Sequence, residues 1–252
     1  DFYDLELLPL ATRMRLTSVV EPVVHIDDAP KEMTLPTTTR SIAQLTEQHE
    51  AIKYLKSRNF DPAVLAKLWN VGYASALDSN YQAQGRLILP VTTNGKIFGW
   101  QARALHGEMP KYQTARGMRR NSVIFNYDLA KTREVGVVCE GPLSAMRVGE
   151  CGMALLGKSL SDTQTKLLGH GFSGKYLIIM TDPDAPGASA DLKIISRLNN
   201  TVFKGVTSIR LQNGDPADHS FEDLWAIINH KLKSEFNLEP INPGVNPDLK
   251  KL

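Results

Sequence analysis

The feature that most limits how this chain can fold is an alternation of apolar runs and helix-like segments after residue 134. The expected strands are "VGVVC", "MALLG", "KYLIIMT" and "VTSIRLQ". The expected helices that follow them are "PLSAMRVGE", "SDTQTKLL", "ASADLKIISRLN" and "SFEDLWAIINHKLK". Strands that alternate with helices at this spacing form βαβ units, which build a parallel sheet. The second half of the chain is therefore predicted to be a Rossmann-like α/β unit.

Carboxylates follow three of these expected strands. Glu140 comes after "VGVVC", Asp182 and Asp184 come after "YLIIMT", and Asp215 comes shortly after "VTSIRLQ". Ligands of open α/β sheets bind outside the carboxyl ends of the strands, so these acids are expected to meet in one crevice. Carboxylates held together raise one another's pKa unless a cation lies between them. Oxygen ligands suit Mg²⁺ or Mn²⁺, so we predict a divalent-metal site for phosphoryl chemistry.

The specificity of this signal lies in the order of the acids. A single Asp-x-Asp after a strand occurs in phosphatases, in sugar transferases and in plain loops. Any one of these acids, taken alone, could be a solvated loop residue. Acids after successive strands of one predicted sheet are a much stronger indication of a shared site.

Positive charge is concentrated in the first half of the chain. The net charge is +2, but between Lys96 and Arg133 eight Lys and Arg residues are opposed by only Glu108 and Asp128. A solvated basic face would explain this excess. A phosphate-binding surface is the more specific interpretation, because clusters of Lys and Arg displace counterions from nucleic acids.

The first half is predicted to be an α+β subdomain. Residues 46–58 have helical spacing with Thr46 as a plausible N-cap, and residues 61–69 form a second expected helix with Asp61 as N-cap. "RLILPV" and "KIFGWQAR" flank an Asn-Gly turn and predict a β-hairpin. The expected divisions are an arm or linker over 1–45, a basic subdomain over 46–133, the parallel-sheet unit over 134–219, and a helix and linker over 220–252.

Cysteine content and apolar run length indicate the compartment in which the protein is expected and the kinds of site and segment it lacks. The two cysteines, Cys139 and Cys151, fit a reduced cytoplasmic compartment, and without a CxxC pair the chain builds no cysteine-rich zinc site. No stretch approaches the roughly 18 apolar residues that a membrane span needs. The first residues are "DFYDLELL", without a visible signal peptide or an initial Met, so we expect a piece of a longer protein.

Several separated segments resemble one family in the same order. "VVCEGPLSA", "ALLGKSLSDTQTKLL" and "YLIIMTDPDAPGASA" resemble the TOPRIM module of bacterial- and phage-type primases, topoisomerases and some nucleases. Upstream, "AIKYLKSRNFDPAVLAKLWNVGYA", "GRLILPVTTNGKIFGWQARAL" and "MPKYQTARG" resemble the RNA polymerase domain of the primase branch. The likeness runs from about Glu47 to Ala226, which is most of the chain.

The resemblance implies a DNA primase core that makes short RNA primers from ribonucleoside triphosphates on single-stranded DNA by two-metal phosphoryl transfer. It implies Mg²⁺ or Mn²⁺ and no zinc in this chain. It also implies a zinc-binding module and a replicative helicase as partners, fused or separate, no membrane, and the cytoplasm of a bacterial or phage-infected cell.

The resemblance also assigns roles to individual residues. Glu140 would bind metal or act as general base, Asp182 and Asp184 would hold the catalytic metals, and Asp215 would complete the metal site with Asp218 as a possible further ligand. The residues expected to meet nucleotide phosphates or the template are Arg86, Arg103, Lys111, Arg119, Arg120 and Lys158.

Two departures leave alternatives open. The family often has Asp in "EGxxD", where this chain has Ser144, and its third acidic motif is usually "DPD", where this chain has "GDPAD". A TOPRIM nuclease or a topoisomerase fragment is the first alternative, although a topoisomerase would need a nucleophilic Tyr in another domain. A catalytically inactive nucleic-acid-binding module is the second.

Overall fold

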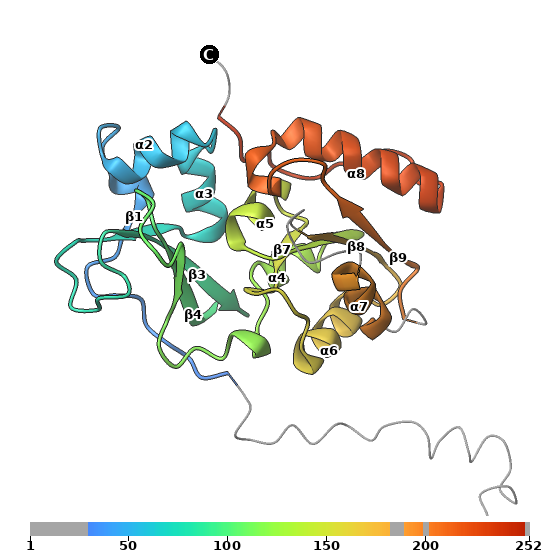
Figure 1. Cartoon of the computed structure of the whole chain (residues 1–252), viewed down its shortest axis with the longest axis horizontal. Helices are drawn as coiled ribbons and strands as arrows, with labels where there is room; N and C mark the ends of the chain where they lie inside the picture. Colours follow the sequence, from blue (N-terminus) through green and yellow to red (C-terminus); the bar gives the residue numbers. More distant parts are fainter. Residues whose placement is uncertain (1–29, 182–188, 199–201, 250–252) are drawn as a thin grey trace, which may run out of the picture.

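Two sheets, one from each half of the chain, form the centre of the structure (Figure 1). The computed structural model describes residues 30–181, 189–198 and 202–249 of the 252-residue chain. The first sheet is antiparallel and has the order β1-β2-β3-β4-β5. Its strands are β1 (Arg40–Ser41), β2 (Gly72–Ala74), β3 (Arg86–Thr93), β4 (Lys96–Arg103) and β5 (Tyr112–Thr114).

The predicted hairpin is confirmed as β3 and β4. Asn94 and Gly95 between them have φ angles of 50° and 74°, the left-handed values that a two-residue hairpin turn requires. The turn sets the pairing of Thr93 with Lys96, and an irregularity between Val91 and Thr92 then shifts the register by one residue, so that Leu87 pairs with Arg103. The turn and this shift together therefore set the position of Arg103, a predicted binding residue.

Two helices, α2 (Glu50–Ser57) and α3 (Pro62–Trp69), precede this hairpin. The prediction for α3 is confirmed, because Asp61 Oδ1 accepts a hydrogen bond from the Ala63 amide at 2.8 Å. The predicted start of α2 at Thr46 is wrong. The His49 amide donates to the Thr46 carbonyl at 3.0 Å in a turn, and His49 itself caps the helix by accepting from the Ala51 amide. The helix begins only after that turn is complete.

The second sheet is parallel throughout and has the order β7-β6-β8-β9, which confirms the predicted α/β unit. Its strands are β6 (Val135–Cys139), β7 (Gly152–Ala154), β8 (Tyr176–Thr181) and β9 (Gly205–Arg210). The helix α4 (Tyr127–Ala130) precedes this half and packs on its sheet, and the helices within it are α5 (Pro142–Val148), α6 (Asp162–Gly171), α7 (Ser189–Arg197) and α8 (Phe221–Phe236). Short 3-10 helices are η3 (Ile42–Gln44), η4 (Arg120–Ser122) and η5 (Pro216–Asp218).

β7 is shorter than the predicted run "MALLG". The chain leaves the strand after Ala154, and Leu156 has a φ angle of 63°, which an extended strand cannot contain. The Leu156 amide donates to the Glu140 carbonyl at 3.0 Å, so this turn is fastened to the end of β6. The two ends of neighbouring parallel strands are thereby held together beside Glu140.

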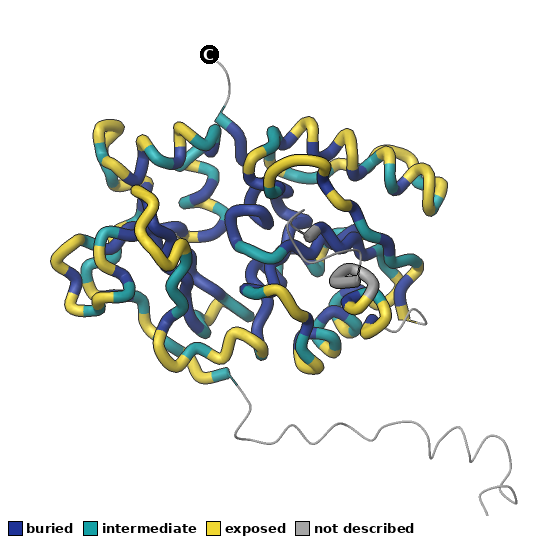
Figure 2. Tube along the Cα trace, in the orientation of Figure 1, coloured by how far each residue is buried: buried dark blue, intermediate teal, exposed yellow. Residues whose placement is uncertain are grey.

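Apolar side chains cover both faces of the parallel sheet. Along β8, Ile178 and Met180 belong to the core that includes side chains of α5 and α8, whereas Leu177 and Ile179 belong to the core that includes side chains of α6 and α7. The first of these cores continues without a break into the antiparallel sheet through side chains such as Leu87 and Leu89. In Figure 2 the buried, dark blue parts of the tube include strands of both sheets, and the shared core shows that the two halves are packed against each other.

Parts of the expected arm and linker pack on the body of the protein. Arg40 and Ser41 pair with β2, and the Met33 amide donates to the Ile97 carbonyl at 2.8 Å. In the tail after α8, Asp248 is 6% exposed and forms an antiparallel bridge with Phe60. The expected linker after the last helix therefore joins α8 to the connection between α2 and α3.

Candidate active site

A cleft of about 380 Å³ lies where the two sheets meet. It is lined by β4 and β5 from the first sheet, and by the residues after β6 and β7 and around η5 from the second half. Six predicted site residues line this cleft, namely Arg103, Lys111, Arg120, Glu140, Lys158 and Asp215. Residues as far apart in sequence as Arg103 and Asp215 therefore share one cavity.

The described lining of the cleft is predominantly cationic. Its positive side chains are Arg58, Arg103, Lys111, Arg120 and Lys158, and its carboxylates are Glu140 and Asp215. Polar neutral groups of Gln101, Tyr112, Thr114 and Ser144 complete the polar lining. Such a lining attracts polyanions, because cations that face one cavity add their potentials there.

Glu140 takes its position from the end of β6. It is the first residue after the strand, and the following residues, Gly141 and Pro142, begin α5 as N-cap and first helical residue. The Leu156 amide holds the Glu140 carbonyl, and Leu156 itself lines the cleft in its left-handed conformation. Left-handed backbone at a non-glycine residue costs about 1–3 kcal/mol and is concentrated at functional sites. The conformation of Leu156 is thus a further indication that this cavity is a functional site.

Asp215 and Asp218 cap η5 reciprocally. Asp215 Oδ1 accepts from the Ala217 amide at 2.8 Å, and Asp218 Oδ2 accepts from the Asp215 amide at 3.0 Å. The other oxygen of Asp218 accepts from Arg58 Nη2 at 2.8 Å, whereas Asp215 Oδ1 lies 3.9 Å from the same nitrogen. Asp215 lines the cleft and Asp218 does not. The two acids of the "GDPAD" segment therefore occupy different environments.

Arg58 is a cleft residue that the sequence prediction missed. It follows α2 directly, and its side chain is only 19% exposed. Burial alone would lower the pKa of its guanidinium, but Tyr54 and the carboxylates of Asp215 and Asp218 raise that pKa above its ordinary value. A basic residue after a helix is usually a solvated helix-end charge, so position alone gave no signal. The available indication was that Arg58 lies in the segment "AIKYLKSRNF", which resembles the RNA polymerase domain of primases.

Arg103 is held by two tyrosines. It is 6% exposed, its Nε donates to the Tyr54 hydroxyl at 2.9 Å, and its guanidinium carbon lies 4.8 Å from the centroid of the Tyr112 ring. Poor solvation raises the pKa of the Tyr112 hydroxyl to about 12, so this group stays neutral and can donate a hydrogen bond. Arg103 is therefore a fixed positive charge on one wall of the cleft.

Gln164 fixes the backbone that carries Arg120. Its side chain is 1% exposed, and its Nε2 donates to the carbonyls of Val123 at 2.9 Å, Leu155 at 3.0 Å and Arg120 at 3.3 Å. Ser161 and Gln164 also form the capping box of α6. One buried amide thus joins the start of α6 to η4 and to the turn after β7, and these are the segments that carry Arg120 and Lys158.

Three described residues of the predicted site lie outside the cleft lining: Arg86, Arg119 and Asp218. Arg86 is 6% exposed and donates to the Pro110 carbonyl at 2.9 Å, so it supports the loop before β5. Arg119 precedes η4 as its N-cap residue. Asp182 and Asp184 lie outside the described residues. β8, the strand that they follow in the sequence, lies between β6 and β9.

Within the described ranges, no three His, Cys, Asp or Glu side chains come together in a way that could hold a metal ion. Glu140 and Asp215 are the carboxylates that the described residues contribute to the cleft lining. In the same part of the chain, no helix has the length and apolar character needed to cross a bilayer.

The relatives of this chain are primases. The chain is 28% identical over 244 residues to the DNA primase of Thermotoga maritima, a match that covers 81% of this chain and 43% of that protein. It is 27% identical over 163 residues to the DNA primase of Synechococcus elongatus, covering 57% of this chain and 24% of that protein. The chain thus spans less than half the length of these curated relatives. No protein-family model matches it.

Solved structures share the fold. The DnaG primase catalytic domain bound to ssDNA matches with a TM-score of 0.63 and 15% identity, over 76% of this chain and 74% of that one. The E. coli primase catalytic core matches with a TM-score of 0.56 and 18% identity, over 78% and 79% of the two chains. The chain is therefore a relative of the bacterial-type DNA primases and has the fold of their catalytic core.

Proposed function

We propose that this chain is the RNA polymerase domain of a DNA primase, which joins ribonucleotides into short primers on a single-stranded DNA template. The observation that carries the proposal is the cleft in which Glu140 and Asp215 face the cations of both halves. The primase relatives support the same activity. A primase acts where DNA is copied, which in a bacterial or phage-infected cell is the cytoplasm, so we place this chain there.

The reaction is attack of a 3′-hydroxyl oxygen on the α-phosphorus of an incoming ribonucleoside triphosphate. The new bond joins that oxygen to the α-phosphate, the bond to the β-phosphate oxygen breaks, and pyrophosphate leaves. We assign the binding of the negative charge of the triphosphate and of the leaving pyrophosphate to Arg58, Lys111 and Lys158, which line the cleft. Glu140 is the candidate to accept the proton of the attacking hydroxyl.

The described lining of the cleft fits a hard divalent cation. It offers the carboxylate oxygens of Glu140 and Asp215 as ligands and contains no cysteine sulfur. Glu140 and Asp215, with Asp182 and Asp184, would hold Mg²⁺ or Mn²⁺. Such ions, when bound, neutralise charge on the attacking and leaving oxygens. Asp218 is the weaker candidate ligand, because its two oxygens already bind Arg58 and the Asp215 amide.

The template and the primer are expected to run along the basic side of the cleft. Tyr54 holds the guanidinium of Arg103 in a defined position, and Gln164 holds the backbone from which the Arg120 side chain extends. Phosphate contacts of this kind position a nucleic acid without specifying its sequence. We therefore assign template selection to a zinc-binding module outside this chain, and expect a replicative helicase as a further partner.

The test is a pair of assays on one single-stranded template with Mg²⁺ or Mn²⁺. The first assay supplies a short RNA primer and measures its extension, and the second measures initiation from free ribonucleotides. This chain should extend better than it initiates, and an added zinc module should restore initiation by raising effective concentration. Template cleavage instead of extension would favour the nuclease alternative, and DNA binding without either activity would favour the inactive module.

A further inference from the structure

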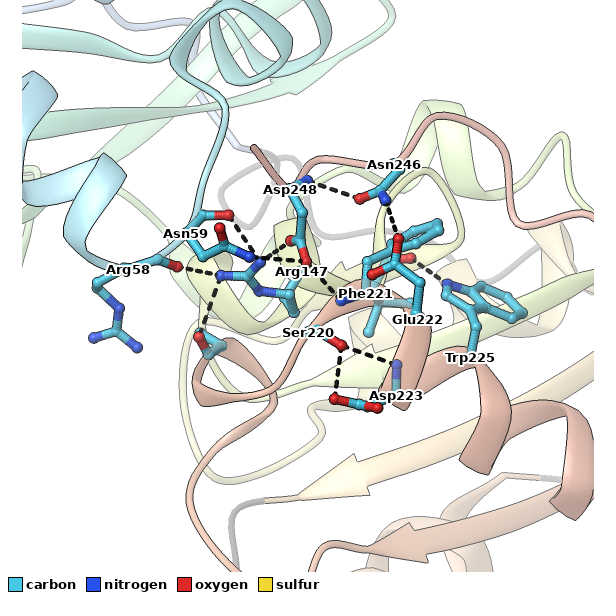
Figure 3. A network of polar contacts seen from close by, with 12 residues as sticks. Arg58, Asn59, Arg147, Ser220, Phe221, Glu222, Asp223, Trp225, Asn246 and Asp248 are labelled. Atoms are coloured by element: carbon cyan, nitrogen blue, oxygen red, sulfur yellow. Dashed lines mark hydrogen bonds and ion pairs between the residues drawn. The ribbon is translucent and has the colours of Figure 1, made fainter. Parts of the chain in front are cut away.

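A buried arginine without a role in the proposed reaction lies behind the cleft. Arg147 is on α5 and is 1% exposed. Its guanidinium pairs with Asp248, which comes from the tail after α8 and is 6% exposed (Figure 3). Burial and the nearby charge of Arg58 lower the pKa of Arg147 to about 10, which leaves it charged at neutral pH. A full positive charge is therefore held in the interior.

Arg147 connects the carbonyl groups of two cleft residues. Its Nη2 donates to the Arg58 carbonyl at 2.5 Å and to the Ala217 carbonyl at 3.4 Å, and its Nη1 donates to the Asn59 carbonyl at 3.3 Å. The guanidinium carbon also lies 3.9 Å from the centroid of the Phe60 ring. The end of α2 and the helix η5 are thus fastened to one side chain.

Asp248 completes the arrangement from the other side. Its Oδ2 accepts from the Phe221 amide at 2.9 Å and from Asn59 Nδ2 at 3.3 Å, as Figure 3 shows in part. The Asp61 amide donates to the Pro247 carbonyl at 2.8 Å, and the Leu249 amide donates to the Asn59 carbonyl at 3.2 Å. The tail therefore binds the α2–α3 connection and the start of α8 at the same point.

Stability alone is a poor explanation for this pair. Removing two charges from water costs about as much as their attraction returns, and an apolar pair of similar volume often serves stability equally well. The fork of a guanidinium can bind several carbonyl groups in fixed directions, which an apolar side chain cannot do. The carbonyls that it binds belong to Arg58 and Ala217, and both residues line the cleft.

We propose that Arg147 and Asp248 are positioning residues, which fix the Arg58 backbone relative to η5 and so set the distance between the Arg58 guanidinium and the Asp215 carboxylate. The consequence for the reaction rests on the proposed function. The consequence for the backbone does not, because the contacts of Arg147 with Arg58 and Ala217 do not depend on any substrate.

The test compares two ways of removing the pair. Asp248→Asn leaves the buried charge of Arg147 without its ionic partner and is expected to destabilise the protein. Arg147→Met combined with Asp248→Leu removes both charges and is expected to keep the fold. Glu150→Gln is the control, because Glu150 is also buried, also holds the tail through the Val245 amide at 2.9 Å, and pairs with Arg133, which does not line the cleft.

Three quantities are measured in each folded variant: primer extension, affinity for a ribonucleoside triphosphate, and hydrogen exchange of backbone amides. In the double variant, extension measured as kcat/KM should fall about tenfold to a hundredfold, mainly through a higher KM for the triphosphate. Amides of residues 58–61 and 215–221 should exchange at least about tenfold faster, while those of β6 and β8 remain unchanged. Glu150→Gln should leave exchange in both segments and the KM unaltered.

Normal exchange in these segments of the double variant would overturn the proposal, and so would a normal KM alongside faster exchange. A wild-type chain that neither extends a primer nor binds the triphosphate would overturn the proposed function instead. In that case the exchange result still decides whether Arg147 and Asp248 position the backbone.

Discussion

Substitution of Gly152 by Ala tests how closely α5 is packed against the parallel sheet. A Cβ atom at Gly152 would lie 2.0 Å from the Ala145 carbonyl oxygen and 2.9 Å from Val148 Cβ. Real Cβ atoms essentially never approach closer than 3.0 Å, so α5 and β7 would have to separate by about 1 Å at this point. The obstacle is backbone, which cannot rotate away as the end of a side chain can.

Overpacking of this kind costs about 1–3 kcal/mol, and we expect the upper end because the interior has few voids to absorb the shift. For a chain of this size, about 3 kcal/mol corresponds to a melting temperature lower by about 6–12 °C. The assay is thermal and urea unfolding followed by circular dichroism. Gly169→Ala is the control, since Gly169 lies in α6 and, among the described residues, its Cβ would meet only Val202 Cγ2 at 3.9 Å. That variant should be more stable by about 0.5–1 kcal/mol. Equal stability of Gly152→Ala and wild type would refute the close packing of α5 on β7.

Three further predictions concern the site and the core. Asp182→Ala or Asp184→Ala should abolish primer extension and leave the melting temperature without metal unchanged or slightly higher, because a repelling carboxylate is removed; a large loss of stability in calorimetry would indicate a structural role. Single Ala variants of Arg103, Lys111 and Arg120 should each reduce the steepness of the plot of log binding constant against log salt concentration for single-stranded DNA by about one unit or slightly less. Unchanged slopes in fluorescence titrations of all three variants would mean that these side chains are solvated and do not bind phosphate. Burial raises the pKa of the Cys151 thiol to about 12, so its reaction with a thiol reagent at pH 8 should require unfolding; rapid labelling of native protein at Cys151, located by mass spectrometry, would contradict the burial of this residue.

Most of the fold could be predicted because its signals are local. Alternating strands and helices after residue 134 gave the parallel sheet, Asn94 and Gly95 gave the hairpin, and Asp61 with Pro62 gave the start of α3. The errors arose where tertiary structure decided the outcome. Thr46 has good capping chemistry, but a turn places His49, whose ring packs edge-on against Tyr73 of β2, at the start of α2.

The site could be predicted only in part, for the same reason. Glu140 and Asp215 share a cavity because both follow parallel strands, a relation that sequence order reveals. The burial of Arg86 beneath Pro110 and the entry of Arg58 into the cleft depend on contacts between distant segments, which no local pattern encodes. Asp248 shows this most clearly, since a Pro- and Asn-rich tail predicts a linker and the structure buries its carboxylate against Arg147.

The proposed function makes the cleft between the two sheets a metal-dependent site for joining ribonucleotides. The most direct measurement is extension of a labelled RNA primer with Mg²⁺ by wild type, Glu140→Gln and Asp223→Asn, with Mn²⁺ binding followed by electron paramagnetic resonance in the same preparations. Glu140→Gln keeps the size of the side chain and removes its charge, so extension should fall a hundredfold or more and Mn²⁺ should bind more weakly. Asp223→Asn changes an acid in the first turn of α8, where its carboxylate accepts from the hydroxyl of the N-cap residue Ser220 outside the cleft lining, and this variant should extend normally. Normal extension and normal Mn²⁺ binding by Glu140→Gln would contradict the assignment of this cleft as the active site.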